Sequence, residues 1–157
     1  MKDPDAMQSG LQLLESAEAA YLTTIDGDGF PQTRAMLNLR NSDQFPALSR
    51  LFSALDDKFV VYFTTNASSA KIEQIRRNPK VSVYYSIPAE WRGLMLGGAM
   101  EIVTDSCLKK AIWQKGWEMY YPGGNDDPDY AILRLSPMVA KYYHQLVSSV
   151  FDLGQKS

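Results

Sequence analysis

Short runs of β-branched and aromatic residues, separated by turn residues, dominate the chain and predict a mainly antiparallel sheet. The predicted strands cover residues 21–25, 31–39, 58–65, 81–87, 91–103, 130–135 and 139–146. Asp26-Gly27-Asp28-Gly29 joins the first two as a hairpin, because glycine readily supplies the positive φ of a tight turn. Gly97-Gly98 predicts a bulge or a close backbone approach inside a long strand.

Helical spacing of apolar residues marks three further segments, at residues 6–20, within 66–77, and from a cap at Asp105 to about residue 119. Residues 40–57 lack a clean period and predict a loop with a helical turn. Strands and helices do not alternate regularly along the chain, and no GxGxxG motif is present, which argues against a Rossmann domain. We therefore predict one α+β domain, residues 1–157, with about six strands closing on themselves.

Composition narrows the function classes. Sixteen basic against eighteen acidic residues give a net charge of −2, which argues against a general nucleic-acid binder. No segment has the apolar length of a membrane helix or the pattern of a signal peptide, so we expect a soluble, cytoplasmic protein. One histidine, His144, and one cysteine, Cys107, supply neither a metal cluster nor a convincing catalytic triad. Redox chemistry in this chain would need a cofactor.

A candidate anion site follows the strand at residues 58–65. There the chain passes through Thr64 and Thr65 to Ser69 and Lys71, where a helix begins, and a helix start offers free N–H groups and a positive dipole end. Arg34, in the middle of another strand, could bind a phosphate bidentately. The plainer interpretation is a capping serine, a solvated lysine and a solvent-facing arginine. A clamp requires the two strands to be neighbours, which the sequence alone does not show.

The order and spacing of several motifs resemble the pyridoxamine 5′-phosphate oxidase-like FMN-binding split-barrel superfamily, and within it the general stress protein 26-like branch. The motifs are Pro31-x-x-Arg34-Ala35-Met36, Tyr62-Phe63-Thr64-Thr65-Asn66-x-x-Ser69-x-Lys71, Asn78-Pro79-Lys80-Val81, a stretch from Trp91 to Glu101, and Tyr121-Pro122-Gly123-Gly124-x-Asp126-Asp127-Pro128-Asp129. The resemblance covers about residues 10–145.

The resemblance implies a six-stranded antiparallel split barrel that forms a homodimer with FMN at the subunit interface. It implies the following roles: Arg34, Ser69 and Lys71 hold the phosphate; Ala35, Met36 and Leu37 run beside the isoalloxazine ring; Thr64 and Thr65 lie near the ring and ribityl chain; Trp91 and the pair Tyr142-Tyr143 approach the cofactor or the interface. Two departures stand out. Ala70 replaces a basic residue common in oxidase members, and the tail lacks their substrate-binding arginine and histidine.

These observations favour an FMN-dependent oxidoreductase acting on a small molecule, with no side chain that must serve as an acid or base. A non-enzymatic flavin carrier or stress protein would use the same residues. A third possibility is a split barrel that binds haem or another flat ligand, for which His144 is the candidate axial ligand.

Overall fold

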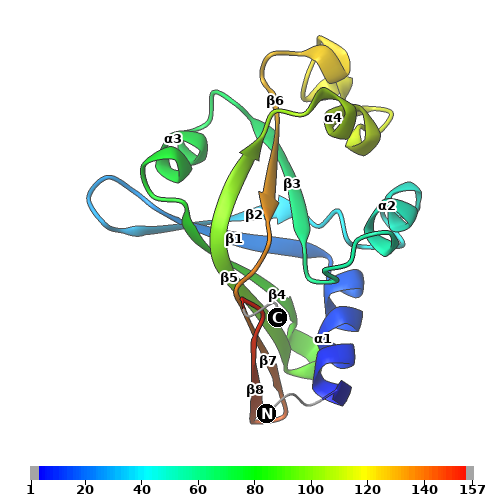
Figure 1. Cartoon of the computed structure of the whole chain (residues 1–157), viewed down its shortest axis with the longest axis vertical. Helices are drawn as coiled ribbons and strands as arrows, with labels where there is room; N and C mark the ends of the chain where they lie inside the picture. Colours follow the sequence, from blue (N-terminus) through cyan, green and yellow to red (C-terminus); the bar gives the residue numbers. More distant parts are fainter. Residues whose placement is uncertain (1–3, 155–157) are drawn as a thin grey trace.

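The computed structural model describes residues 4–154, within which eight strands and four α-helices form one half-closed barrel (Figure 1). The strands are β1 (Ala19–Ile25), β2 (Pro31–Leu37), β3 (Val61–Asn66), β4 (Lys80–Ile87), β5 (Arg92–Val103), β6 (Tyr130–Leu135), β7 (Val139–His144) and β8 (Val147–Asp152). The α-helices are α1 (Pro4–Ser16), α2 (Ser49–Ser53), α3 (Ala70–Arg77) and α4 (Ser106–Ile112). Short 3₁₀ turns cover Pro46–Leu48, Pro88–Glu90, Trp117–Met119 and Gly124–Asp126.

The α+β split barrel that we predicted is confirmed, with two strands beyond the six. Six strands follow one another in the order β2-β1-β4-β5-β6-β3, and every pairing is antiparallel. β2 and β3 stand at the two ends of this path and are not paired with each other. The barrel is therefore split between these two strands.

Strand β5 changes partners along its length, and glycines make this possible. Its first half pairs with β7 and its last residues pair with β6. A Cβ atom at Gly98 would lie 3.3 Å from the backbone of both Pro137 and Met138, where the chain passes from β6 to β7. The close approach that Gly97-Gly98 predicted is therefore present, while pairing with β4 continues through both glycines without a bulge.

The last strand of the fold was missed from the sequence. The strand predicted at 139–146 ends at His144, because Gln145 and Leu146 turn the chain with φ of 49° and 69°. β8 then returns along β7, so that the two project as an arm at one end of the molecule (Figure 1). Only Phe151 of β8 is buried, which explains why its sequence carries little apolar signal.

Two predicted helices are shorter than expected. The helix predicted at 6–20 ends at Ser16, because Asn38 Nδ2 donates to the carbonyl oxygens of Leu14 and Ala17, at 2.8 and 2.9 Å, and so caps the last turn. The helix predicted from Asp105 to 119 is capped by that aspartate but ends at Ile112. Gly116, at φ of 98°, then reverses the chain before a 3₁₀ turn.

The apolar residues form two clusters. The larger fills the barrel, with α1 and α3 packed against it through residues such as Leu13, Leu14, Ile72 and Ile75. The smaller is rich in aromatic rings and joins α2, α4 and the segment that follows α4 to the outer side of β3 and β6. This second cluster places residues 113–130 over one end of β3, so that Tyr120 and Tyr121 lie beside Thr64 and Thr65.

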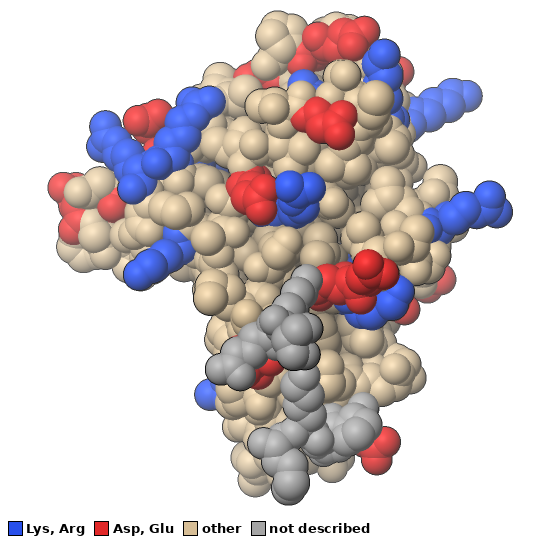
Figure 2. Space-filling model, viewed as in Figure 1, with Lys and Arg blue, Asp and Glu red and all other residues tan. Residues whose placement is uncertain are grey.

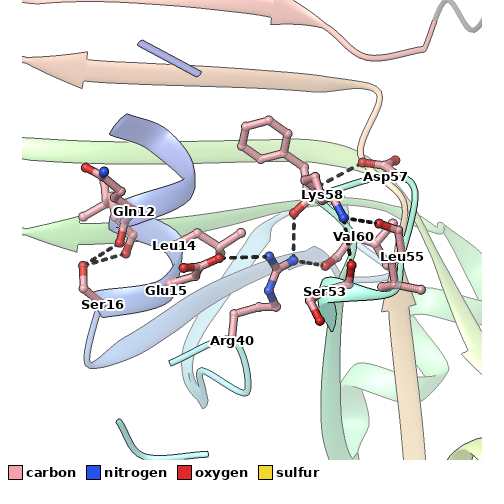
Figure 3. Close-up of polar contacts among 12 residues, drawn as sticks. Gln12, Leu14, Glu15, Ser16, Arg40, Ser53, Leu55, Asp57, Lys58 and Val60 are labelled. Carbon is pink, nitrogen blue, oxygen red and sulfur yellow. Dashed lines mark hydrogen bonds and ion pairs between the residues drawn. The ribbon is translucent and has the colours of Figure 1, made fainter. Parts of the chain in front are cut away.

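Arg40 is a buried cation in the segment that we predicted to be a loop (Figure 3). Its Nη1 donates to the carbonyl oxygens of Lys58 and Val60, at 2.8 and 2.7 Å, and its guanidinium lies 4.8 Å from the centre of the Phe52 ring. Its Nη2 lies 3.7 Å from Glu15 Oε1. Arg40 therefore ties α1, α2 and the start of β3 together.

Surface charge is mixed in sign. On the face shown in Figure 2, Lys and Arg side chains gather beside acidic ones at the end where Figure 1 places α3, which carries Lys71, Glu73, Arg76 and Arg77. No helix among residues 4–154 combines the length and apolar composition needed to cross a bilayer.

Candidate functional site

A cavity of about 420 Å³ lies at the split of the barrel. It is lined by Ala35, Met36 and Leu37 from β2, by Thr64, Thr65 and Asn66 from β3, and by Glu18, Ala19, Lys71, Tyr120 and Tyr121. The volume falls within the roughly 300–1,000 Å³ typical of small-molecule sites. Strands β2 and β3 thus supply its two main walls. Six of the residues that the family resemblance singled out line the cavity: Ala35, Met36, Leu37, Thr64, Thr65 and Lys71.

Thr65, Ser69 and Lys71 form one hydroxyl and ammonium cluster at the start of α3. Lys71 Nζ donates to Thr65 Oγ1 at 2.8 Å, and Thr65 Oγ1 lies 3.5 Å from Ser69 Oγ. Ser69 occupies the N-cap position, yet its side chain makes no capping hydrogen bond. The plainer interpretation of these residues is therefore wrong on two counts, because the serine does not cap the helix and the lysine is not fully solvated.

Arg34 lies half-buried beside this cluster, held by neutral oxygens. Nη1 donates to Thr24 Oγ1 at 2.7 Å and to Leu22 O at 3.3 Å, and Nη2 donates to Gln74 Oε1 of α3 at 3.3 Å. Burial lowers the pKa of Arg34. Burial, and then the charge of Arg34, lowers the pKa of Lys71 as well, so the two cations repel each other.

Neither cation of this pair has a carboxylate partner among residues 4–154, where the ion pairs join Arg40, Arg77, Arg92 and Arg134 to glutamates. Two half-buried cations without a counter-charge repel each other, and this repulsion is unfavourable in the ligand-free protein. A phosphate would supply the missing negative charge and accept bonds from both. This pair, with Thr65 and Ser69, is a candidate anion site.

Arg34 lies on strand β2, and Lys71 lies at the start of α3, which follows strand β3. β2 and β3 are not hydrogen-bonded neighbours; they face each other across the split. Arg34 and Ser69 do not themselves line the cavity. Ser69 Oγ lies 3.5 Å from Oγ1 of Thr65, which lines the cavity, and Arg34 lies close enough to Lys71 for its charge to lower the pKa of that lysine.

Sequence reasoning missed five residues of the cavity wall: Glu18, Ala19, Asn66, Tyr120 and Tyr121. Tyr121 is buried, and its side chain is hydrogen-bonded to that of Thr64. Burial raises the pKa of Tyr121, so its phenol stays protonated at neutral pH. The Tyr121-Pro122-Gly123-Gly124 motif was the available signal, but only the fold brings that loop to β3.

Trp91 and Tyr143, two of the predicted site residues, lie in another part of the molecule. They line a separate hollow of about 410 Å³ with Gln145 and Leu146. Trp91 is 75% exposed and has a positive φ of 52°, which is unusual for a large residue. Within one chain, the structure therefore does not place these two aromatic residues on the cavity at the split.

His144, the candidate axial ligand for haem, is also away from that cavity. It lines a third hollow with residues of α1 and β8. Among residues 4–154, no three His, Cys, Asp or Glu side chains are grouped so that they could hold a metal ion.

Comparison with known proteins supports the architecture and extends it. The family model described as "Pyridoxamine 5'-phosphate oxidase like" matches residues 5–154. The chain belongs to this family. The resemblance drawn from its motifs is thereby confirmed, and the split-barrel geometry is that of the family.

Individual members give finer detail. A pyridoxine/pyridoxamine 5′-phosphate oxidase of Pseudomonas putida is 34% identical over 88 residues, which cover 56% of this chain and 34% of that enzyme. The chain thus matches about a third of the length of this curated relative. A Clostridium acetobutylicum protein related to general stress protein 26 is 28% identical, with a TM-score of 0.76 and 98% of each chain covered.

A heme binding protein from Mycobacterium smegmatis shares the fold, with a TM-score of 0.69 at 13% identity, and covers 98% of this chain and 60% of that one. At this identity the likeness concerns the fold alone.

Proposed function

We propose that this family member binds FMN in the cavity at the split and works as a homodimeric, cytoplasmic, flavin-dependent oxidoreductase acting on a small molecule. The single observation that carries the proposal is the pair Arg34 and Lys71. They are half-buried, repel each other, and have no carboxylate partner among the described residues. The free thiol of Cys107 fits a reducing compartment.

The residues that line the cavity, together with Arg34 and Ser69 beside it, suit the parts of FMN. Arg34, Lys71, Thr65 and Ser69 would hold the phosphate, since together they offer a guanidinium, an ammonium and two hydroxyls. Ala35, Met36 and Leu37 on β2 would run along the ring. Strand β2 is an edge strand, so the outer side of its backbone has groups free for a ligand to contact.

FMN, when bound, supplies transfer of a hydride or of single electrons. The chain's own part is to bind, orient and shield. Thr64 would lie near the ring and ribityl chain, held by its hydrogen bond with Tyr121. Tyr121, kept neutral, would donate or accept a hydrogen bond without adding charge, and half-exposed Tyr120 would limit access of water from outside.

An exposed apolar face supports the homodimer. The register places Tyr21, Tyr84, Met95, Lys141 and Val150 in one row across β1, β4, β5, β7 and β8. Tyr21, Tyr84 and Val150 are 43%, 42% and 59% exposed, and Trp91 and Leu146 stand out nearby. A second copy on this face would bury these side chains. It would also allow Trp91 and Tyr143 to reach the partner's cofactor, as the resemblance implied.

The first test of this proposal is an absorption spectrum. The purified chain is mixed with excess FMN, passed through a desalting column, and measured in the visible range, with its mass determined by light scattering. We expect about one FMN per chain, the ratio of one cavity per subunit, on a dimer. Loss of all flavin on the column, or a monomer at micromolar protein, would contradict the corresponding part of the proposal.

Turnover separates the enzyme from a flavin carrier. Steady oxidation of NAD(P)H, or steady oxygen consumption with a reduced donor, is expected only of the oxidoreductase. The haem-binding alternative gains no support from the position of His144, which does not line the cavity at the split.

A further inference from the structure

The turn that joins β3 to α3 is held from outside by Asp129. This residue lies just before β6, in the Asp126-Asp127-Pro128-Asp129 stretch of the sequence. Its Oδ2 accepts a hydrogen bond from Asn66 Nδ2 at 2.7 Å, and its Oδ1 accepts one from the Ser68 backbone N–H at 2.8 Å. Its own carbonyl oxygen accepts the Ala67 N–H at 2.7 Å. Three consecutive residues of the turn are thus bonded to one residue.

Asp129 is itself fixed by the residue two before it. Asp127 accepts the Asp129 N–H through Oδ1 at 2.9 Å and the Gly123 N–H through Oδ2 at 2.8 Å. The chain from Gly123 to Asp129 is therefore a compact, hydrogen-bonded loop. It is anchored at its start by Tyr121, which packs against Tyr130 with ring centres 5.0 Å apart.

The braced turn lies directly between the two parts of the proposed phosphate site. Thr65 precedes it, and Ser69 and Lys71 follow it. Asn66 also lines the cavity. A shift of Ser68 would carry Ser69 with it and change the geometry in which Thr65, Ser69 and Lys71 present their donors.

We propose that Asp129 is a positioning residue for the phosphate of FMN, which it does not touch: its carboxylate fixes the 66–68 turn so that Thr65, Ser69 and Lys71 converge on one anion. This assignment rests on the proposed function. The Asp129 carboxylate places a negative charge near an anion site, and this charge alone would weaken phosphate binding. The hydrogen bonds of Asp129 should therefore raise the affinity for the FMN phosphate, whereas its charge should lower it, and experiment can separate the two effects.

The test compares FMN with riboflavin, which is FMN without the phosphate. Dissociation constants for both are measured by flavin fluorescence on wild type, Asp129→Ala, Asp129→Asn and Asp126→Ala. Asp126 is the matched control, because it is an exposed aspartate of the same loop for which the structure gives no side-chain hydrogen bond. Circular dichroism and thermal unfolding establish that each variant is folded. The backbone bond from Ala67 to residue 129 remains in every variant.

We expect Asp129→Ala to weaken FMN binding about tenfold, the effect of one or two lost hydrogen bonds, and to leave riboflavin binding within about twofold of wild type. Asp129→Asn keeps an acceptor for the Ser68 N–H and should retain most of the affinity. Asp126→Ala should change neither constant.

Three results would overturn the assignment. One is an Asp129→Ala variant whose preference for FMN over riboflavin changes less than threefold. The second is equal weakening of both flavins, which indicates a general disturbance of the cavity. The third is tighter FMN binding by Asp129→Ala, which indicates that charge outweighs position. If the wild-type protein binds neither flavin, the proposed function itself is overturned. This outcome differs from one in which the wild-type protein binds FMN but Asp129 has no positioning role.

Discussion

Arg34 and Arg40 stand close together in the sequence, but Arg40 is buried and Arg34 is half-buried, and their surroundings differ. Arg40 is surrounded by partners that belong to the fold: Glu15 and the carbonyl oxygens of Lys58 and Val60 (Figure 3). The ring of Phe52 lies against its guanidinium. Among residues 4–154, Arg34 bonds only to neutral oxygens, and a second cation, Lys71, lies near it. A buried cation with a complete set of partners stabilises the fold, whereas one that lacks a counter-charge is suited to bind a ligand.

The largest expected effect is on Arg40. Arg40→Met would leave the carbonyl oxygens of Lys58 and Val60 without their donor in a buried place and remove the link to Glu15. We expect a loss of about 3 kcal/mol in the free energy of unfolding. Urea unfolding measures it, with Arg50→Met, at an exposed position of α2, as the control. A loss of under about 1 kcal/mol would show that the contacts of Arg40 do not hold α1, α2 and the start of β3 together.

The second effect is on the ligand and not on the fold. Arg34→Ala should weaken FMN binding by about 1.5–3 kcal/mol, the scale of a charge-assisted hydrogen bond. The ligand-free protein should lose little stability, because the change also relieves repulsion of Lys71. Calorimetric titration gives the affinity, and Arg76→Ala, which removes an exposed charge from the same helix as Lys71, is the control. Equal FMN affinity in Arg34→Ala and wild type would reject the clamp.

These two arginines also mark how far sequence reasoning reaches. Arg34 was identified because a charged residue inside a strand requires a partner. Arg40 was missed because it lies in a segment without periodicity, where burial depends on packing between α1 and α2. Strands β1 to β7 were predicted because their β-branched and aromatic residues mark buried positions locally, whereas β8, with only Phe151 buried, was missed. The end of α1 was not, since Asn38, distant in sequence, caps it.

The candidate site also contains residues that the local sequence identifies and residues that only the fold brings there. The residues proposed to bind the phosphate lie on short local motifs, so each could be singled out from the sequence, although their proximity could not. Tyr121 and Asp129 act on β3 and its turn from a loop far along the chain, and only the paired strands β3 and β6 bring them there. No local pattern carries that information.

The smallest expected effect is a pH dependence from Lys71. Its pKa is lowered in the folded state, so between that lowered value and the ordinary 10.5 the unfolded chain binds more protons. Stability of the ligand-free protein should therefore rise with pH across this window. FMN affinity should fall across the same window, because the ammonium is lost.

The control for this pH dependence is Lys71→Met, which removes the titrating group. Urea unfolding and FMN titration between about pH 8 and 10.5 should show both trends in wild type and a weakened form of each in the variant. Identical pH profiles for wild type and Lys71→Met would mean that Lys71 is fully charged throughout and does not titrate with binding.

The most direct test of the central claim is a crystal structure of the chain grown with FMN. We predict the phosphate within hydrogen-bond distance of the Arg34 guanidinium and Lys71 Nζ, with the ring against β2 in the cavity at the split, and Arg40 unchanged in its contacts. Flavin bound with its phosphate away from both Arg34 and Lys71, for example in the hollow that Arg40 lines between α1 and α2, would contradict the account.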